Sequence, residues 1–130
     1  ASYPRQMGLG VLTITSFPVR HSVPCRALRI TEGVKTFVYT GDTNDCPGLS
    51  DFCRGADALL ADAAFLTEEW RDTRPHMSAA GAARLAQNAG VKRLYLTHLP
   101  LRHAPQTLEA QAREIFPGAQ AVAPGMVISL

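Results

Sequence analysis

The sequence predicts one layered α/β domain, in which helices pack on a mixed β-sheet. Three observations support this prediction. Strand-like apolar runs occupy the first 40 residues, helical periodicity appears only later, and helix and strand segments then alternate to the end of the chain. With 130 residues, 46% of them hydrophobic and 18% charged, the chain suits a single globular domain. The expected order is β-β-β-α-β-α-β-α-β-β, without an internal repeat.

The first half of the chain is dominated by strands, which are expected over residues 9–15, 26–30 and 35–40. Glu32 and Gly33 form the turn between the last two strands. The next segment, GDTNDCPG, is rich in turn formers, so the β run ends in a polar loop that carries Asp42 and Asp45. A short helix, LSDFCRGA, and a buried strand, DALLA, follow this loop.

The second half alternates between helices and strands. After a polar loop over residues 66–75, Ser78 is expected to cap a helix over 79–89 that ends at Gly90. A strand then runs to His98. An amphipathic helix over 105–116 and a final hairpin around Pro124-Gly125, formed by AQAVA and MVISL, complete the chain.

Composition excludes several classes of function. The net charge of +2 arises from 13 basic and 11 acidic residues spread along the chain, which argues against a dedicated nucleic-acid or membrane-surface binder. The apolar runs are too short to span a bilayer, and no signal-peptide pattern opens the chain, so we expect a cytoplasmic protein. Cys25, Cys46 and Cys53 lack paired C-x-x-C spacing and are interpreted as packing or surface thiols in a reducing compartment.

Five polar residues are candidates for chemistry, because loops at strand ends collect functional groups in layered α/β domains. His21, Asp42 and His98 each follow an expected strand and have the ligand types of a zinc or other transition-metal site. His76 precedes the Ser78-capped helix and is a candidate general acid, with Asp62 to orient it. Each residue taken alone also suits a simple turn, capping or surface role. His103, beside Arg102, is expected to be solvated.

In order along the chain, five segments resemble the C-terminal half of the metallo-β-lactamase-fold hydrolases, most closely the ribonuclease Z-like branch. The segments are FPVRHSVPCRALRI, YTGDT, GADALLADAAF, PHMSAAGAARLAQNAGVKRL and LYLTHLPLR. The resemblance covers residues 11–130 and implies half of an αββα sandwich, with helices packed on one face of a mixed sheet. It also implies that His21 binds a first metal, Asp42 bridges two metals and His98 binds the second.

The resemblance has two departures. Ala61, Asp62 and Ala64 stand where the ribonuclease Z strand motif H-E-A-T-F has His, Glu and Thr, which leaves open whether the shorter carboxylate of Asp62 reaches His76. The family's H-x-H-x-D-H motif, which supplies four ligands from the N-terminal half, does not occur in residues 1–130. Residues 1–130 are therefore expected to be one domain that supplies only part of a binuclear site, with metal binding weak or absent in this chain alone.

The resemblance implies a metal-dependent hydrolase in which a metal-bridging hydroxide attacks an ester or phosphodiester, while His76, oriented by Asp62, assists the leaving group. Zinc is the expected metal, with manganese or iron as alternatives. The expected partners are the missing N-terminal half or a complementary subunit, together with a small ester or phosphodiester substrate. The alternative function is a non-catalytic domain that binds a partner or self-associates as a homodimer and retains relic metal ligands.

Overall fold

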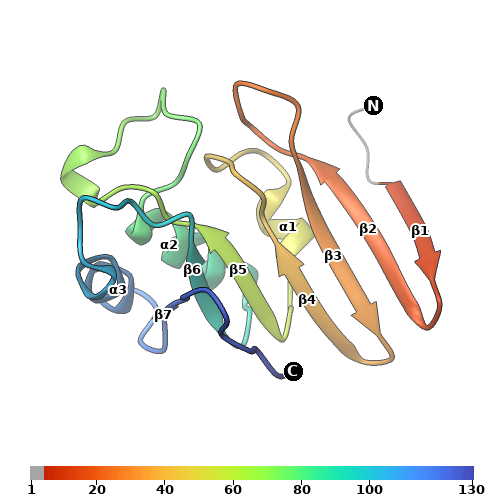
Figure 1. Cartoon of the computed structure of the whole chain (residues 1–130). Coiled ribbons are helices and arrows are strands. Elements are labelled where there is room, and N and C mark those ends of the chain that lie inside the picture. The colour runs from red at the N-terminus through yellow and green to blue at the C-terminus, as the bar shows by residue number, and fades with distance from the viewer. Residues whose placement is uncertain (1–4) are drawn as a thin grey trace.

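The structure is a computed structural model that describes residues 5–130, in which seven strands form one mixed sheet (Figure 1). The strands are β1 (Arg5–Leu9), β2 (Leu12–Pro18), β3 (Arg26–Glu32), β4 (Lys35–Tyr39), β5 (Ala58–Asp62), β6 (Leu94–Thr97) and β7 (Gln120–Ala121). The helices are α1 (Leu49–Cys53), α2 (Ala79–Ala89) and α3 (Pro105–Arg113). A short 3₁₀ helix spans Thr67–Glu69, inside the segment predicted to be a loop.

The sheet changes from antiparallel to parallel in its middle. Strands β1 to β4 pair antiparallel with their neighbours in sequence, whereas β4, β5, β6 and β7 pair in parallel. Parallel neighbours require crossover connections, and α1, α2 and α3 lie in those connections. The predicted layered α/β fold with a mixed sheet is therefore confirmed.

The core lies between the sheet and the helices; in Figure 1, α1 and α2 lie behind the strands and α3 lies at the left of the sheet. Alternating residues of β4, β5 and β6, such as Val38, Leu59 and Leu96, are fully buried there. Helix α2 packs against them through an alanine-rich face, and small side chains allow the helix to approach the strands closely. As predicted, the Ser78 hydroxyl accepts the Gly81 N–H at 2.9 Å and caps the start of this helix.

Two predicted elements are wrong. The strand expected over residues 9–15 is part of a hairpin, in which β1 and β2 meet at a turn where Gly10 has a φ of 60°. The final hairpin does not form: β7 contains only Gln120–Ala121, and residues 126–130 have no strand structure. Strand β7 lies at the edge of the sheet and is only two residues long, so it offers the terminal segment little backbone to pair with.

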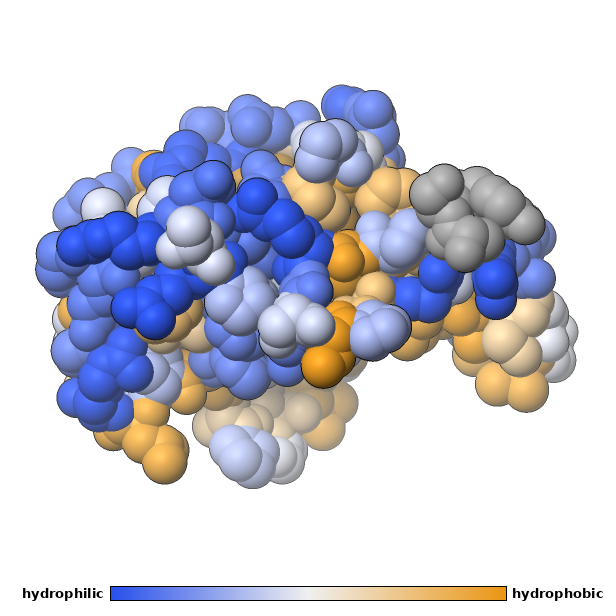
Figure 2. Space-filling view, turned by 90° about the horizontal axis from the view of Figure 1, so that it is seen from above, coloured by the Kyte–Doolittle hydropathy of each residue, from blue (hydrophilic) through white to orange (hydrophobic). Residues whose placement is uncertain are grey.

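The sheet face opposite the helices is apolar and partly open. Its register aligns side chains across the strands, such as Ile14 beside Ile30 and Ile30 beside Phe37. Towards β1 the exposed fraction rises, reaching 58% at Met7 and 60% at Leu9. Figure 2 shows hydrophobic residues in the hollow between the helix-bearing body and the strand pair at the N-terminal end.

Within residues 5–130, no helix has the length and apolar character needed to cross a membrane.

Candidate functional site

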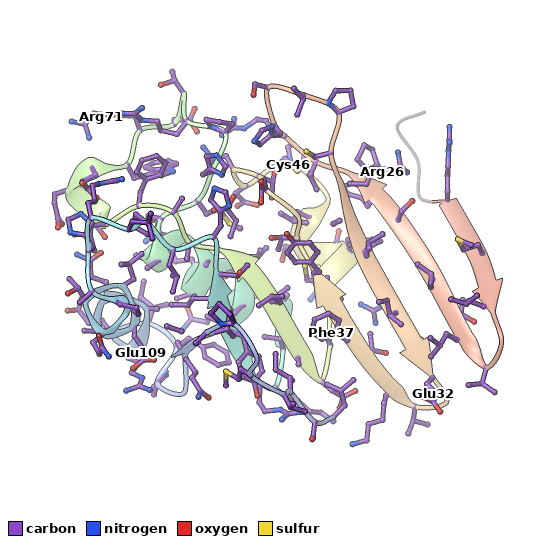
Figure 3. All side chains as sticks on the ribbon, viewed as in Figure 1. Arg26, Glu32, Phe37, Cys46, Arg71 and Glu109 are labelled. Carbon is purple, nitrogen blue, oxygen red and sulfur yellow. The ribbon has the colours of Figure 1, made fainter. Side chains whose placement is uncertain are left out.

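The structure brings all five candidate residues together at one end of the sheet. Figure 3 shows the side chains of several loops gathered at this end. Asp42 follows β4, Asp62 ends β5 and His98 follows β6, while His21 lies in the loop after β2 and His76 lies just before α2. The imidazole rings of His76 and His98 stack with centroids 4.5 Å apart and an interplanar angle of 14°. The ring of His21 approaches His76 edge-on at 5.2 Å. Parallel strands place their carboxyl ends at the same edge, which explains how residues so far apart in sequence meet.

His76 and Asp62 form the shortest polar contact of this cluster, 2.6 Å from Nδ1 to Oδ2. The side chain of Asp62 is completely buried, and that of His76 is 17% exposed. Asp62 Oδ2 also accepts the N–H of Thr43 at 2.9 Å, and Oδ1 accepts the N–H of Ala64 at 3.2 Å. The shorter carboxylate at position 62 therefore reaches His76. It holds the ring by Nδ1 and leaves Nε2 for other contacts.

Burial shifts the pKa values of this pair in opposite directions. It raises the pKa of Asp62 to about 7, against the opposing effect of the Thr43 N–H bond. Burial also lowers the pKa of His76, although the nearby carboxylate of Asp42 acts to raise it. Burial thus disfavours the charged form of each group, and the 2.6 Å contact requires a proton between Oδ2 of Asp62 and Nδ1 of His76.

The backbone around the candidate metal ligands adopts left-handed conformations. His98 has a φ of 57°, a conformation that costs a non-glycine residue of order 1–3 kcal/mol and is typical of functional sites. This turn places Nδ1 of His98 3.4 Å from Oδ1 of Asp42. Gly41, directly before Asp42, has a φ of 67°, and a Cβ there would lie 3.0 Å from the carbonyl oxygen of Arg26. Glycine is therefore strongly favoured at this position, two residues after β4.

The loop after β4 contributes contacts that the sequence did not reveal. Thr43 and Asn44 are buried, and both bond to the segment that precedes His21. Thr40 Oγ1 accepts the N–H of Asp62 at 3.1 Å, which ties the ends of β4 and β5 together. The sequence signal here was only a cluster of turn formers, a pattern that predicts a loop without telling which of its side chains point inward.

A cleft of about 290 Å³ opens beside the cluster. His76 and His98 line it together with Phe65 and Arg102. The guanidinium carbons of Arg74 and Arg102 lie 5.2 Å and 5.6 Å from the centre of the Phe65 ring, within cation–π range. The cleft therefore has basic and aromatic groups next to the two imidazoles.

His103 is not solvated, contrary to the prediction. Its side chain is 26% exposed, and Nε2 lies 3.0 Å from Oε1 of Glu69. Arg102 binds the same carboxylate through Nε and Nη2, at 3.1 Å and 3.3 Å. These bonds lower the pKa of Glu69 to about 2, Arg102 contributing most. His103 thus belongs to an ion-pair group that braces the loop after His98, apart from the imidazole cluster.

The donor types at the sheet edge fit a transition metal, because two imidazoles and a carboxylate, from His21, His98 and Asp42, lie around one region. No three such groups in the described part of the chain already converge as a complete ligand set. The nitrogen and oxygen donors are thus of the right kind, and further ligands are needed to complete a site.

Comparisons with known proteins decide the family. A family model described as a beta-lactamase superfamily domain matches residues 3–99. The probable metallo-hydrolase YhfI of Bacillus subtilis is 36% identical over 109 residues, which are 84% of this chain. The chain belongs to the metallo-β-lactamase superfamily. A ribonuclease Z of Myxococcus xanthus is 42% identical over 94 residues, 68% of this chain, in agreement with the predicted resemblance.

Solved structures support the assignment of this chain to the metallo-β-lactamase superfamily. The crystal structure of YhfI, described as a metallo-β-lactamase fold protein, matches with a TM-score of 0.86 at 34% identity and covers 92% of this chain and 50% of its own. Human tRNase Z, short form, shares the fold with a TM-score of 0.76 at 21% identity, over 95% of this chain and 44% of its own. The chain spans half or less of the curated relatives, 45% of YhfI and 30% of the ribonuclease Z.

Proposed function

We propose that this chain supplies part of the active site of a metal-dependent hydrolase that cleaves an ester or phosphodiester bond. The observation that carries the proposal is the convergence of His21, Asp42, Asp62, His76 and His98 at one sheet edge, with His76 bonded to a fully buried carboxylate at 2.6 Å. A buried acid–base pair beside metal-type donors suits hydrolysis. The similarity to a probable metallo-hydrolase supports the same class of reaction.

His21, Asp42 and His98 would hold the metal ions, for which zinc is the first expectation and manganese or iron the alternatives. When bound, the ions would supply Lewis acidity and an activated water at neutral pH. Asp62 holds the ring of His76 by Nδ1, so Nε2 of His76 is the atom that would transfer a proton to the leaving group. Arg102 and Phe65 line the adjoining cleft, where a substrate would lie.

Site-directed variants of the full-length protein test this assignment. We expect His98→Ala to lose bound metal, measured by mass spectrometry of the metal content, together with hydrolysis of bis(p-nitrophenyl) phosphate and of a p-nitrophenyl ester. His76→Ala should retain the metal and lose about 10²- to 10⁴-fold in rate, since it removes a proton donor. His103→Ala is the matched control, because this imidazole bonds to Glu69 away from the cluster. Retention of metal and rate by His98→Ala would refute the proposal.

The open sheet face is a surface that a further part of the protein would cover. The chain covers only about half of YhfI, and the face opposite the helices carries apolar side chains that are half exposed or more, including Met7 and Leu9. We propose that a further part of the same protein, or a complementary subunit, covers this face and supplies the remaining metal ligands.

The same face also favours a second candidate function, a non-catalytic domain that self-associates or binds a partner. Sedimentation of the full-length protein with and without zinc separates the two. A monomer whose metal binding and hydrolysis fall together with His98→Ala supports the enzyme. A zinc-independent homodimer without hydrolase activity supports the binding domain.

A further inference from the structure

A buried side-chain amide holds the loop that carries His76. Asn44 is 1% exposed and lies two residues after Asp42. Its Nδ2 donates to the carbonyl oxygen of Asp72 at 3.2 Å and to that of Arg74 at 2.9 Å. Both carbonyls belong to residues 70–77, the loop that leads to His76 and α2. Both protons of the amide are therefore used on this loop.

The remaining polar atoms of Asn44 bond to two other segments. Its Oδ1 accepts the N–H of Asp45 at 2.8 Å, which fixes the orientation of the amide within the loop after β4. Its backbone N–H donates to the carbonyl oxygen of Arg20 at 3.2 Å, directly before His21. One residue thus joins the segments that present His21, Asp42 and His76.

The neighbouring residue extends the same arrangement. The N–H of Thr43 donates to Oδ2 of Asp62, the same oxygen that contacts Nδ1 of His76. The loop after β4 therefore holds the carboxylate that orients His76 through residue 43, and the backbone that carries His76 through residue 44. The bond of Thr43 to Asp62 is buried, and the Asn44 side chain that donates the other bonds is 1% exposed, so losing either is costly.

The end of the loop next to α2 is also held, because the Ala64 N–H donates to the carbonyl oxygen of Met77 at 3.0 Å. The other contacts to residues 70–76 are less able to hold the loop in place. Arg20 Nη2 bonds to Asp72 at 3.1 Å, but these side chains are 45% and 80% exposed, and exposed ion pairs contribute little. Trp70 Nε1 donates to the carbonyl oxygen of His76 at 3.0 Å, a bond within the loop itself. The amide of Asn44 is the buried link between this loop and the Asp42 side of the site.

We infer that Asn44 is a positioning residue that sets the place of His76 relative to Asp42 and His21. The expected effect of Asn44 on the reaction rests on the proposed function, in which His76 is the proton donor. Proton transfer requires the donor to lie within a fraction of an ångström of its productive position, so the placement of the loop affects the rate. Among residues 5–130, the side chain of Asn44 forms no hydrogen bond with the imidazole rings and would act through the loop.

The test uses the full-length, metal-loaded protein with Asn44→Asp and Asn44→Ala. Aspartate keeps the shape and the bond to the Asp45 N–H but places oxygen against two carbonyls, whereas alanine removes the amide without adding charge. Asn88→Asp is the matched control, because Asn88 is exposed on α2. We expect kcat for bis(p-nitrophenyl) phosphate to fall about 10- to 100-fold in both Asn44 variants, with KM and metal content little changed. Hydrogen exchange of residues 70–77 should accelerate, and the control should match wild type.

Each outcome either supports or overturns the role of Asn44. Unchanged kcat and unchanged loop exchange would overturn the inference, and so would a loss of metal equal to the loss of rate, because Asn44 would then act on metal binding. If both variants fail to fold, nuclear Overhauser effects are measured on the wild-type protein instead. Contacts from the side-chain amide protons of Asn44 to the backbone of residues 72–75 support the inference, and their absence refutes it. A wild-type protein without hydrolase activity would refute the proposed function. Hydrogen exchange and Overhauser contacts would still test whether Asn44 holds the loop of His76.

Discussion

Replacing Gly41 with alanine tests how strongly the turn ahead of Asp42 is constrained. Gly41 has a φ of 67°, and the left-handed conformation costs a residue with a Cβ about 1–2 kcal/mol. The new Cβ would also lie 3.0 Å from the carbonyl oxygen of Arg26, a backbone atom of β3, and this strand has little freedom to move because it pairs with both β2 and β4. We expect a loss of unfolding free energy of about 2 kcal/mol or more.

Gly33→Ala is the matched control for this variant. Gly33 has a φ of 59°, but a Cβ added there would meet no atom within 4 Å beyond its chain neighbours, so only the conformational cost applies. Urea denaturation of the full-length variants measures the loss of stability in both variants. The free energy of unfolding falls by about 1–3 kcal/mol per M urea, so the midpoint of Gly41→Ala should fall by roughly 1 M. Equal midpoints for the two variants would show that the contact with Arg26 costs nothing, and an unchanged midpoint for Gly41→Ala would refute the conformational argument as well.

Three further predictions concern pH, thiol reactivity and helix capping. The pKa of Glu69 is lowered to about 2, so the stability that this carboxylate contributes is complete above pH 4.5, its ordinary pKa, and is lost as the pH falls towards 2. In urea unfolding measured at a series of pH values, Glu69→Gln should therefore lose less stability in acid than wild type does. Glu68→Gln, the control, should lose as much as wild type. Burial raises the pKa of the Cys53 thiol to about 12, so iodoacetamide at pH 8 should label this thiol only after the protein unfolds. Peptide mass mapping measures the labelling, and rapid labelling of the native protein would contradict the burial of Cys53. Ser78→Ala should cost about 1 kcal/mol in thermal or urea unfolding, because the Gly81 N–H loses its acceptor, and no measurable loss would refute the cap.

Secondary structure was predictable where local signals were strong. Helix α2 matches its prediction residue for residue, because Ser78 and Gly90 mark its ends and alanines fill its buried face. The prediction failed at both ends of the sheet. MVISL has the alternation of a strand, but its expected partner, β7, is only two residues long. The β1–β2 hairpin turns at Gly10 within what reads as one apolar run. Pairing, which decides these cases, depends on distant strands.

In the candidate site, too, some residues could be predicted from local sequence signals and others could not. His21, Asp42 and His98 were recognisable because each follows a strand and matches an ordered motif. Residues 43 and 44 were not, since a turn-rich segment does not reveal which side chains become buried. His103 was misassigned because its partner, Glu69, lies 34 residues away in sequence.

The sequence by itself determined the alternation of strands and helices, the caps of α2 and the order of motifs that identifies the superfamily. These are local properties, set by side-chain periodicity and by the backbone preferences of glycine, serine and proline. Only the tertiary structure decided that Asp62 reaches His76, that the His76 and His98 rings stack, and that Asn44 links the loop of His76 to that of Asp42. The reason is physical: these contacts join strand ends that the parallel sheet brings together, and sequence spacing carries no information about distances across a sheet.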